Sequence, residues 1–397
     1  MTVLAISSCG KLDSDGKLRP RKDITLTKSE TEYVREGNEL AFRYFKEVYS
    51  RSNFIISPFS LQRGLGMVQN GAQGKTHEEI ASVIGFDGAD NESINNYLRS
   101  YTKQLLAVDP SVSFELADAL LVGSWFSIKD DYRETVTSSY GAEVKGLDFF
   151  NEPDKSKTWI NDWVKNKTGG MIPSLVEEVD PMTVSMALNA LAFKGKWSSV
   201  FDPGKTTSNY AFHLWGGKIG VVDMMLQTES FEYAEDDQYQ LLRMPYGNGA
   251  FEMVFLLPLE KNGDVQAVSL EQWERLLSKA EEKELPVGIP KFKIETALSL
   301  DGHLSNMGMP TSFSGEADFS LIADVPGTIR LKDTRQACYI EVDESGAKAA
   351  AATVIPAGLT GAPLTKKTEF IADHPFLFAI IERSTQGILL MGQFCGQ

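Results

Sequence analysis

The sequence contains few of the residues from which disulfide frameworks and metal sites are built. Its 397 residues include only three cysteines, Cys9, Cys338 and Cys395, and four histidines. The cysteines are too few and too scattered for a disulfide framework, and the histidines show no metal-ligand spacing. Cys338 and Cys395 lie in or beside apolar runs, which predicts buried free thiols. We therefore expect no metal site and no cofactor.

Long apolar runs and positive charge are also lacking. No stretch approaches about 18 uninterrupted apolar residues, so the sequence predicts no helix that spans a bilayer. Lys and Arg number 39 against 54 Asp and Glu, which gives a formal net charge of -15, and there is no long basic run. Nucleic acid and anionic membranes are therefore poor partners on electrostatic grounds.

The common motifs of catalysis are absent as well. The sequence has no GxSxG, HExxH, Walker A or GxGxxG pattern. A catalytic triad can be assembled from residues that are distant in sequence, so this absence does not by itself exclude an enzyme. It nevertheless favours a function other than catalysis, and we expect the chain not to be an enzyme.

The first residues resemble the end of a bacterial lipoprotein signal. A short apolar run and small residues precede Cys9, and a polar stretch follows it. A basic segment and most of a hydrophobic segment are missing from that pattern. Two interpretations stay open: Cys9 carries a lipid and residues 1–29 tether an extracytoplasmic protein to the outer membrane or cell surface, or Cys9 lies in a frayed tail of a secreted protein.

Residues 30–397 are predicted to form one large domain, because no repeat, low-complexity block or linker divides them. Hydrophobic periodicity predicts the elements within this domain. The predicted helices are Tyr33–Tyr49 and Trp159–Lys167, and the predicted strands are Asn53–Ile56, Met186–Phe193, Met253–Leu257, Phe376–Ile381 and Ile388–Phe394. The last two strands are joined by a polar turn and should form a hairpin. Helices come mainly first and strands mainly later, which is typical of an α+β fold.

Residues 344–374 form an unusual segment. An alanine-rich run that includes Lys348 follows Gly346, and Pro356, Gly358 and Pro363 come soon after it. No local structure is well encoded there, and a loop of this length in a compact domain is usually functional or disordered. In an extended chain Ala347, Ala349, Ala351 and Thr353 would share one face, and Lys348 would point the other way. Such small residues suit both an exposed loop and a central strand.

Several motifs, taken in their order along the chain, make the sequence similar to the serpins from about residue 33 to the end. The segments that carry the resemblance are Asn53–Leu61, Gly71–Ile80, Ile160–Val164, Asn189–Trp197, Glu344–Thr353 and His374–Phe378 with Met391-Gly392. The resemblance implies an α+β serpin fold with a large five-stranded central sheet, two further sheets and about nine helices. It also implies an exposed reactive-centre loop, here about residues 346–374.

The resemblance further implies a suicide-type protease inhibitor. In the family mechanism a protease cuts the loop and forms an acyl-enzyme, and the loop then inserts into the central sheet with the protease attached. Target proteases would be trypsin-like, with elastase-like and papain-like enzymes as further candidates, and we expect a monomer. The implied hinge of the loop consists of Glu344, Gly346, Ala347, Ala349, Ala350, Ala351, Ala352 and Thr353.

Positions that control sheet opening can be carried over in the same way. Ser57, Ser60 and Asn189 match the family's shutter, and Gln336 stands where the family has a histidine. Glutamine can still bridge by hydrogen bonds, but it removes any protonation-dependent opening. Trp197 matches the breach tryptophan.

An ion pair is expected beside that tryptophan. The resemblance predicts that Glu344 pairs with Lys291 in the breach.

Three arguments place the scissile bond differently. The family's usual span, counted from Gly346, gives Thr360-Gly361, whereas counting back from the strand at Pro375-Phe376 gives Leu364-Thr365. A trypsin-like specificity pocket would accept Lys366 or Lys367.

We favour Lys367-Thr368, with Lys366-Lys367, Leu364-Thr365 and Thr360-Gly361 as alternatives. Cleavage at Lys367 leaves about seven residues beyond the usual span, which is roughly 20 Å of additional tether.

A second function remains open, a non-inhibitory serpin that acts as a binding or carrier protein. Non-inhibitory members often carry bulky or charged residues at inward-facing hinge positions. This hinge has only alanine and threonine there, which favours the inhibitor.

Overall fold

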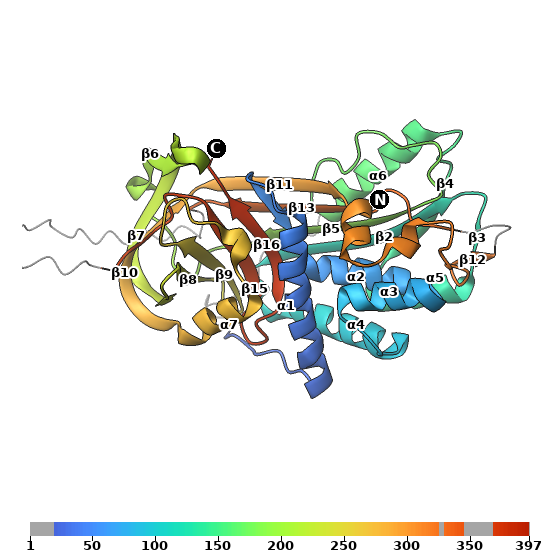
Figure 1. Ribbon diagram of the computed structural model, residues 1–397, viewed down its shortest axis with the longest axis horizontal. Coiled ribbons are helices and arrows are strands. Elements are labelled where there is room, and N and C mark those ends of the chain that lie inside the picture. Colours follow the sequence, from blue (N-terminus) through green and yellow to red (C-terminus); the bar gives the residue numbers. More distant parts are fainter. Residues whose placement is uncertain (1–19, 325–328, 345–367, 397) are drawn as a thin grey trace, which may run out of the picture.

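A computed structural model describes residues 20–324, 329–344 and 368–396. Figure 1 shows a central sheet that runs lengthwise through the molecule, with helices on both of its faces. The described residues contain eight α-helices, close to the about nine expected, and none of them is long and apolar enough to cross a membrane. They are α1 (Lys28–Val48), α2 (Pro58–Gln69), α3 (Gly74–Ile84), α4 (Asn91–Val108), α5 (Asp130–Tyr140), α6 (Pro153–Lys167), α7 (Leu270–Lys279) and α8 (Asp301–Met307).

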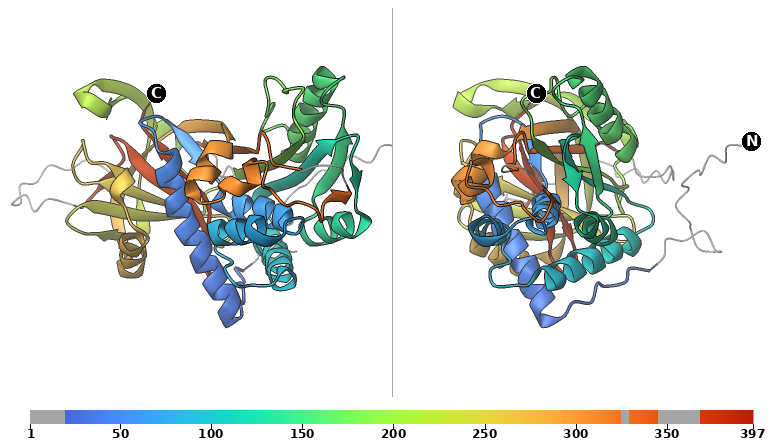
Figure 2. Two further views of the ribbon diagram at one scale, coloured as in Figure 1. Left: turned by 45° about the vertical axis from the view of Figure 1, so that its right-hand side comes forward. Right: turned by 90° about the vertical axis from the view of Figure 1, so that its right-hand side faces the viewer.

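The central sheet has five strands in the order β11-β13-β5-β2-β4. Their bounds are β2 (Ser113–Gly123), β4 (Glu143–Leu147), β5 (Ser185–Lys194), β11 (Phe292–Ser299) and β13 (Arg335–Val342). Helix α6 covers one face of this sheet, and α2 packs against β5 and β2 on the opposite face, as both views of Figure 2 show. Because both faces are covered, β5 is buried along nearly its whole length, which explains its almost uninterrupted apolar sequence.

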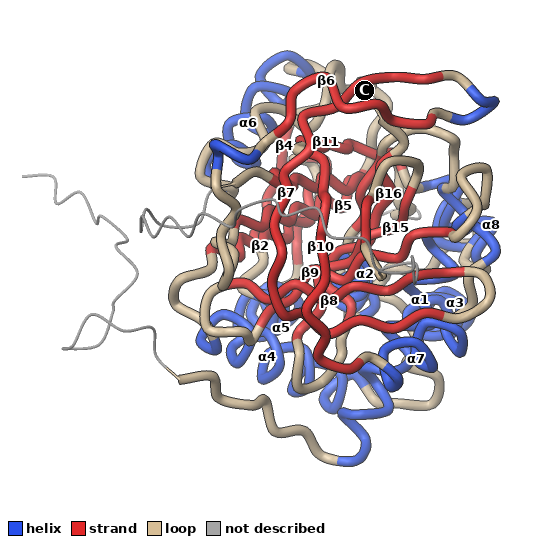
Figure 3. The backbone as a smooth tube through the Cα atoms, turned by 90° about the vertical axis from the view of Figure 1, so that its left-hand side faces the viewer, coloured by secondary structure: helices blue, strands red, loops and turns tan. Residues whose placement is uncertain are grey.

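A second sheet contains nine strands and a third contains two. The nine-stranded sheet has the order β1-β16-β15-β9-β8-β7-β10-β14, with β6 paired to β7, and β12 pairs with β3. The bounds are β1 (Phe54–Ile56), β3 (Ser127–Ile128), β6 (Thr207–His213), β7 (Ile219–Glu235), β8 (Tyr239–Tyr246), β9 (Phe251–Pro258), β10 (Glu281–Pro290), β12 (Ala323–Asp324), β14 (Phe370–Ile371), β15 (Phe376–Glu382) and β16 (Ile388–Phe394). Figure 3 shows β7 and β10 side by side across one end of the molecule.

The predicted elements agree with this architecture. The helix expected at Tyr33–Tyr49 is α1, which begins earlier because Thr27 and Glu30 form a capping box. The predicted C-terminal hairpin is confirmed, since β15 pairs antiparallel with β16. Cys338 and Cys395 are buried free cysteines, as expected.

Candidate functional site

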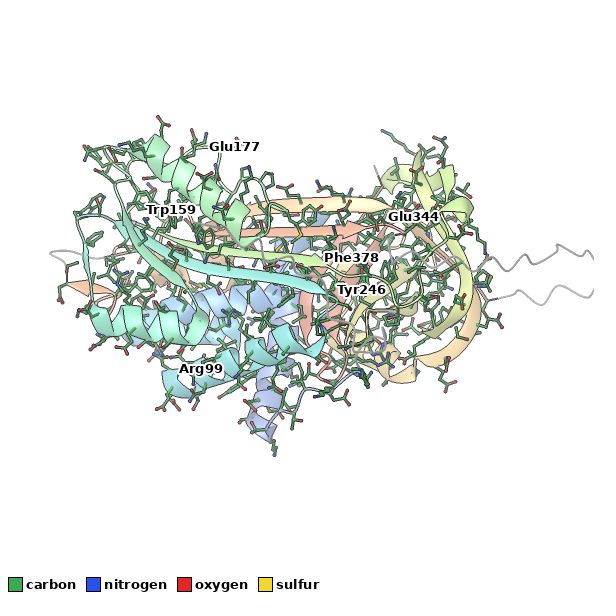
Figure 4. All side chains as sticks on the ribbon, turned by 180° about the vertical axis from the view of Figure 1, so that it is seen from behind. Arg99, Trp159, Glu177, Tyr246, Glu344 and Phe378 are labelled. Atoms are coloured by element: carbon green, nitrogen blue, oxygen red, sulfur yellow. The ribbon has the colours of Figure 1, made fainter. Side chains whose placement is uncertain are left out.

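The site centres on β13 and β5, two neighbouring strands of the central sheet that run parallel. Their register pairs Arg335 with Leu188 at one end and Ile340 with Phe193 at the other. Strand β13 leads directly to Glu344, the last described residue before the segment 345–367. Glu344 therefore lies at one end of the central sheet, and Figure 4 shows it there, in the opposite half of the molecule from Trp159 of α6.

Gln336 joins these two strands to the helix beneath them. Its Nε2 donates to Asn189 Oδ1 on β5 and to the backbone carbonyl of Ser57, both at 2.9 Å. Its Oε1 accepts from the Ser57 backbone N–H at 3.0 Å and from the Tyr44 hydroxyl at 3.1 Å. Gln336 is 1% exposed, so these four hydrogen bonds satisfy all four hydrogen-bonding positions of a buried amide.

Ser57 and Ser60 belong to the same cluster because they form the first turn of α2. Ser57 is the N-cap of that helix, and its Oγ accepts from the Ser60 N–H at 3.1 Å and donates to the Leu389 carbonyl at 2.7 Å. The Ser60 carbonyl accepts from Asn189 Nδ2 at 2.8 Å. The structure thus brings together Ser57, Ser60, Asn189 and Gln336, which the sequence had assigned to one site.

A buried ion pair extends this cluster to the neighbouring strand, and our sequence reasoning missed it. Asn189 Nδ2 also donates to Asp118 Oδ1 on β2 at 2.7 Å, and Arg63 on α2 contacts Asp118 Oδ2 at 3.0 Å. Burial raises the pKa of Asp118, although Arg63 and Asn189 act against that shift. Arg63 makes further hydrogen bonds to Thr102 and to the Tyr140 carbonyl. One signal was available: Asp118 is a charged residue followed directly by the apolar run Ala119–Val122 of the same strand.

Trp197 lies at the end of the sheet from which the loop departs. Its Nε1 donates to the Asp343 carbonyl at 2.9 Å, immediately after β13. Its ring stacks on Tyr246 with 4.1 Å between the centroids. Trp197 therefore connects the end of β13 to the strands of the second sheet.

Glu344 contacts Lys291 with 2.8 Å between Oε2 and Nζ, so the structure contains the ion pair that was expected there. Thr206 donates to Glu344 Oε1 at 2.6 Å. Burial acts to raise the pKa of Glu344, but the hydrogen bonds from Lys291 and Thr206 outweigh it and lower the pKa. These contacts hold the last described residue before the loop.

Thr368 is the first described residue after the loop. Lys283 of β10 donates to its Oγ1 at 2.9 Å, and β14 follows at once, pairing parallel with β10. The remaining predicted loop and lipid positions lie outside the described residues: Cys9, Gly346, Ala347, Ala349, Ala350, Ala351, Ala352, Thr353, Thr360, Gly361, Leu364, Thr365, Lys366 and Lys367. Within the described ranges, no group of three or more His, Cys, Asp or Glu residues is placed to hold a metal ion.

The geometry around Gln336 generates a prediction about stability. Gln336→Leu should lower the free energy of unfolding by about 3 kcal/mol, because the buried polar groups of Ser57 and Asn189 lose their partner. Urea unfolding of both proteins measures the change. Gln266→Leu, at an exposed glutamine, is the matched control and should change the free energy by less than about 0.5 kcal/mol. Equal unfolding midpoints for Gln336→Leu and the unmodified chain would contradict this account.

Comparisons with known proteins agree with this geometry. The family model described as Serpin (serine protease inhibitor) matches residues 35–396. An uncharacterised serpin-like protein of Thermococcus kodakarensis is 33% identical, over 94% of this chain and 87% of its own length. Iripin-2 of Ixodes ricinus is 30% identical, over 92% and 93%.

A solved structure of human thyroxine-binding globulin has the same fold. Its TM-score is 0.83 at 23% identity, and the match covers 93% of this chain and all of that one. Together with the match of the family model over residues 35–396, these comparisons show that the chain belongs to the serpin family, most of whose members are protease inhibitors.

Proposed function

We propose that this chain is a suicide-type protease inhibitor that inserts its cleaved loop between β5 and β13. The observation that carries the proposal is that β5 and β13 pair in parallel and that β13 directly precedes the loop in the chain. A chain that turns back after Glu344 would run antiparallel to both strands. One parallel ladder would then be replaced by two antiparallel ladders, which are slightly more stable per residue.

The chemistry of trapping belongs to the protease. Its serine or cysteine nucleophile attacks the carbonyl carbon of the scissile bond, an ester or thioester to the enzyme forms, and the C-terminal segment departs with a new amino group. The inhibitor then removes its cleaved loop from the protease surface by insertion before water hydrolyses the acyl-enzyme. Loop insertion therefore competes with deacylation.

The free energy that drives loop insertion comes from the new hydrogen bonds that the inserted strand forms in the central sheet. About a dozen new hydrogen bonds at roughly 1 kcal/mol each give on the order of 10 kcal/mol before side-chain packing is counted. This is comparable to the stability of a whole domain. The intact form must therefore be kinetically trapped, and we assign the trap to the contacts of Gln336 with Asn189 and Ser57, together with the pair of Glu344 with Lys291.

We place the scissile bond at Lys367-Thr368. The hydrogen bond from Lys283 to Thr368 supports this choice, because it fixes the residue just after the bond against β10. A trypsin-like protease would accept Lys367 in its acidic pocket. Lys366-Lys367, Leu364-Thr365 and Thr360-Gly361 remain alternatives for proteases of other specificity.

The carrier function is the second candidate, because the fold is shared with a globulin whose structure contains thyroxine. Small side chains at Ala347, Ala349, Ala351 and Thr353 favour the inhibitor, since bulky residues there would obstruct insertion.

Mixing the protein with trypsin, elastase and papain in turn tests the inhibitor directly. We expect a band at the summed mass on a denaturing gel, because the acyl bond survives denaturation. Mass spectrometry of the released C-terminal peptide should identify Thr368 as its first residue. Ala347→Arg should convert the inhibitor into a cleaved substrate without that band, whereas Lys348→Arg, on the outward-facing side, should still trap the protease. Clean loop cleavage of the unmodified chain without a covalent band would rule out the inhibitor.

We further propose that the chain is a bacterial member similar to miropin, which a lipid on Cys9 holds at the cell surface. The lipoprotein-like sequence around Cys9 supports this. After expression in a bacterium behind a lipoprotein signal sequence, the protein should partition into detergent, and Cys9→Ala should move it to the aqueous phase. Aqueous partitioning of both would contradict the anchor.

A further inference from the structure

Two side chains of the nine-stranded sheet hold the first described residues after the loop. Lys283 of β10 donates from Nζ to Thr368 Oγ1 at 2.9 Å. Gln240 of β8 donates from Nε2 to the Glu369 carbonyl, also at 2.9 Å. Both strands lie at the end of the molecule that faces the viewer in Figure 3. We call Lys283 and Gln240 the loop clamp.

Tyr233 of β7 supports both members of the loop clamp. The Lys283 Nζ lies 5.4 Å from the centroid of the Tyr233 ring, which is a cation–π contact. Gln240 Nε2 also donates to the Tyr233 hydroxyl at 2.8 Å, and that hydroxyl donates to Glu235 at 2.5 Å. Burial raises the pKa of Tyr233, so its hydroxyl stays protonated at neutral pH. The two donors of the loop clamp are therefore held in position before any protease arrives.

The chain joins the sheet through its backbone only after the loop clamp. Strand β14 consists of Phe370 and Ile371, which pair with β10. Phe370 is fully buried, and its ring centroid lies 6.3 Å from that of Phe255. Without the loop clamp, Phe370 would be the first residue fixed to the sheet. With it, the fixed part of the chain begins two residues earlier, at Thr368.

The clamped residues remain within reach of a protease. Thr368 is half-buried and Glu369 is exposed. A protease orders the residues on both sides of the bond that it cuts, and each flexible residue that becomes ordered costs conformational entropy. Residues that are already fixed reduce this cost, so a bond directly before them is bound more readily.

Two adjacent lysine bonds make this effect measurable. Lys366-Lys367 and Lys367-Thr368 both place a lysine before the bond, so the acidic pocket of a trypsin-like protease does not distinguish them. After Lys367-Thr368 come two residues that the loop clamp holds. After Lys366-Lys367 comes Lys367 itself, which precedes the loop clamp. Selection between the two bonds must therefore come from contacts outside that pocket.

We propose that Lys283 and Gln240 are positioning residues that direct a trypsin-like protease to Lys367-Thr368 in preference to Lys366-Lys367. This rests on the proposed inhibitory function, in which a protease cleaves the loop. The folded body of the chain, and not the loop sequence alone, then determines which of the two bonds is cut.

The test measures the ratio of cleavage at Lys367-Thr368 to cleavage at Lys366-Lys367. Trypsin is mixed with the folded chain and, separately, with a synthetic peptide of residues 361–373. Both mixtures are denatured at early times, and mass spectrometry quantifies the two C-terminal fragments. Because the peptide lacks the loop clamp, we expect the ratio to be about tenfold higher in the folded chain than in the peptide.

Variants of the loop clamp should move this ratio in steps. Lys283→Met keeps the apolar stem over Tyr233 but loses the donor, and should lower the ratio about threefold. The double variant with Gln240→Leu should lower it about tenfold, to the value of the peptide. Lys283→Arg retains a donor and should keep the ratio of the unmodified chain. Lys279→Met, at an exposed lysine at the end of α7, is the matched control and should leave the ratio unchanged.

Equal ratios in the double variant and the unmodified chain would overturn the loop clamp as a selector of the bond. A ratio that rises in the variants would overturn it as well, by showing that the clamp obstructs the protease. So would a folded chain that trypsin cuts at neither lysine bond. Failure of the proposed function is a separate outcome, because the fragment ratio can be read from cleaved protein even where no covalent band forms.

Discussion

The hydrogen bond between Gln336 on β13 and Asn189 on β5 joins the two strands that must separate if the central sheet is to accept another strand between them. It belongs to a buried polar cluster rather than to apolar packing. Ser57 and Tyr44 complete the hydrogen bonds of Gln336, so all four hydrogen-bonding positions of its buried amide are occupied while the sheet is closed. A satisfied buried network specifies one arrangement and is costly to leave half-made. These properties suit a barrier between two states of the same sheet.

The ion pair of Arg63 with Asp118 fixes the side of this cluster that faces β2. Arg63 belongs to α2 and Asp118 to β2, and Asn189 contacts Asp118 with the same amide nitrogen that binds the Ser60 carbonyl. A buried ion pair adds little net stability compared with apolar packing, but removal of one partner is strongly destabilising. We interpret this ion pair as the contact that holds β5 and β2 in place on α2. The central sheet would then open between β5 and β13 rather than between β5 and β2.

Much of the fold could be predicted because its signals are local. The apolar runs of β15 and β16 with a polar turn between them indicated a hairpin, and the apolar spacing within Tyr33–Tyr49 indicated the helix that is α1. The pair of Glu344 with Lys291 followed from resemblance. The contact of Arg63 with Asp118 could not be predicted, because these residues are 55 positions apart and no local pattern couples them. The proximity of the loops after β2, after β4 and before β5 could not be predicted either, since only the pairing of β4, β2 and β5 brings them together.

We propose that the closed central sheet is a kinetically trapped state, and that the sheet reaches a more stable state when the cleaved loop inserts into it as a new strand. Thermal unfolding of the intact protein and of protein cut once in the loop by a protease that it does not trap measures this directly. The account predicts that the cut form unfolds at a midpoint at least about 10 °C higher, because the inserted strand adds on the order of 10 kcal/mol. A cut form that unfolds at the same or a lower temperature would contradict the claim.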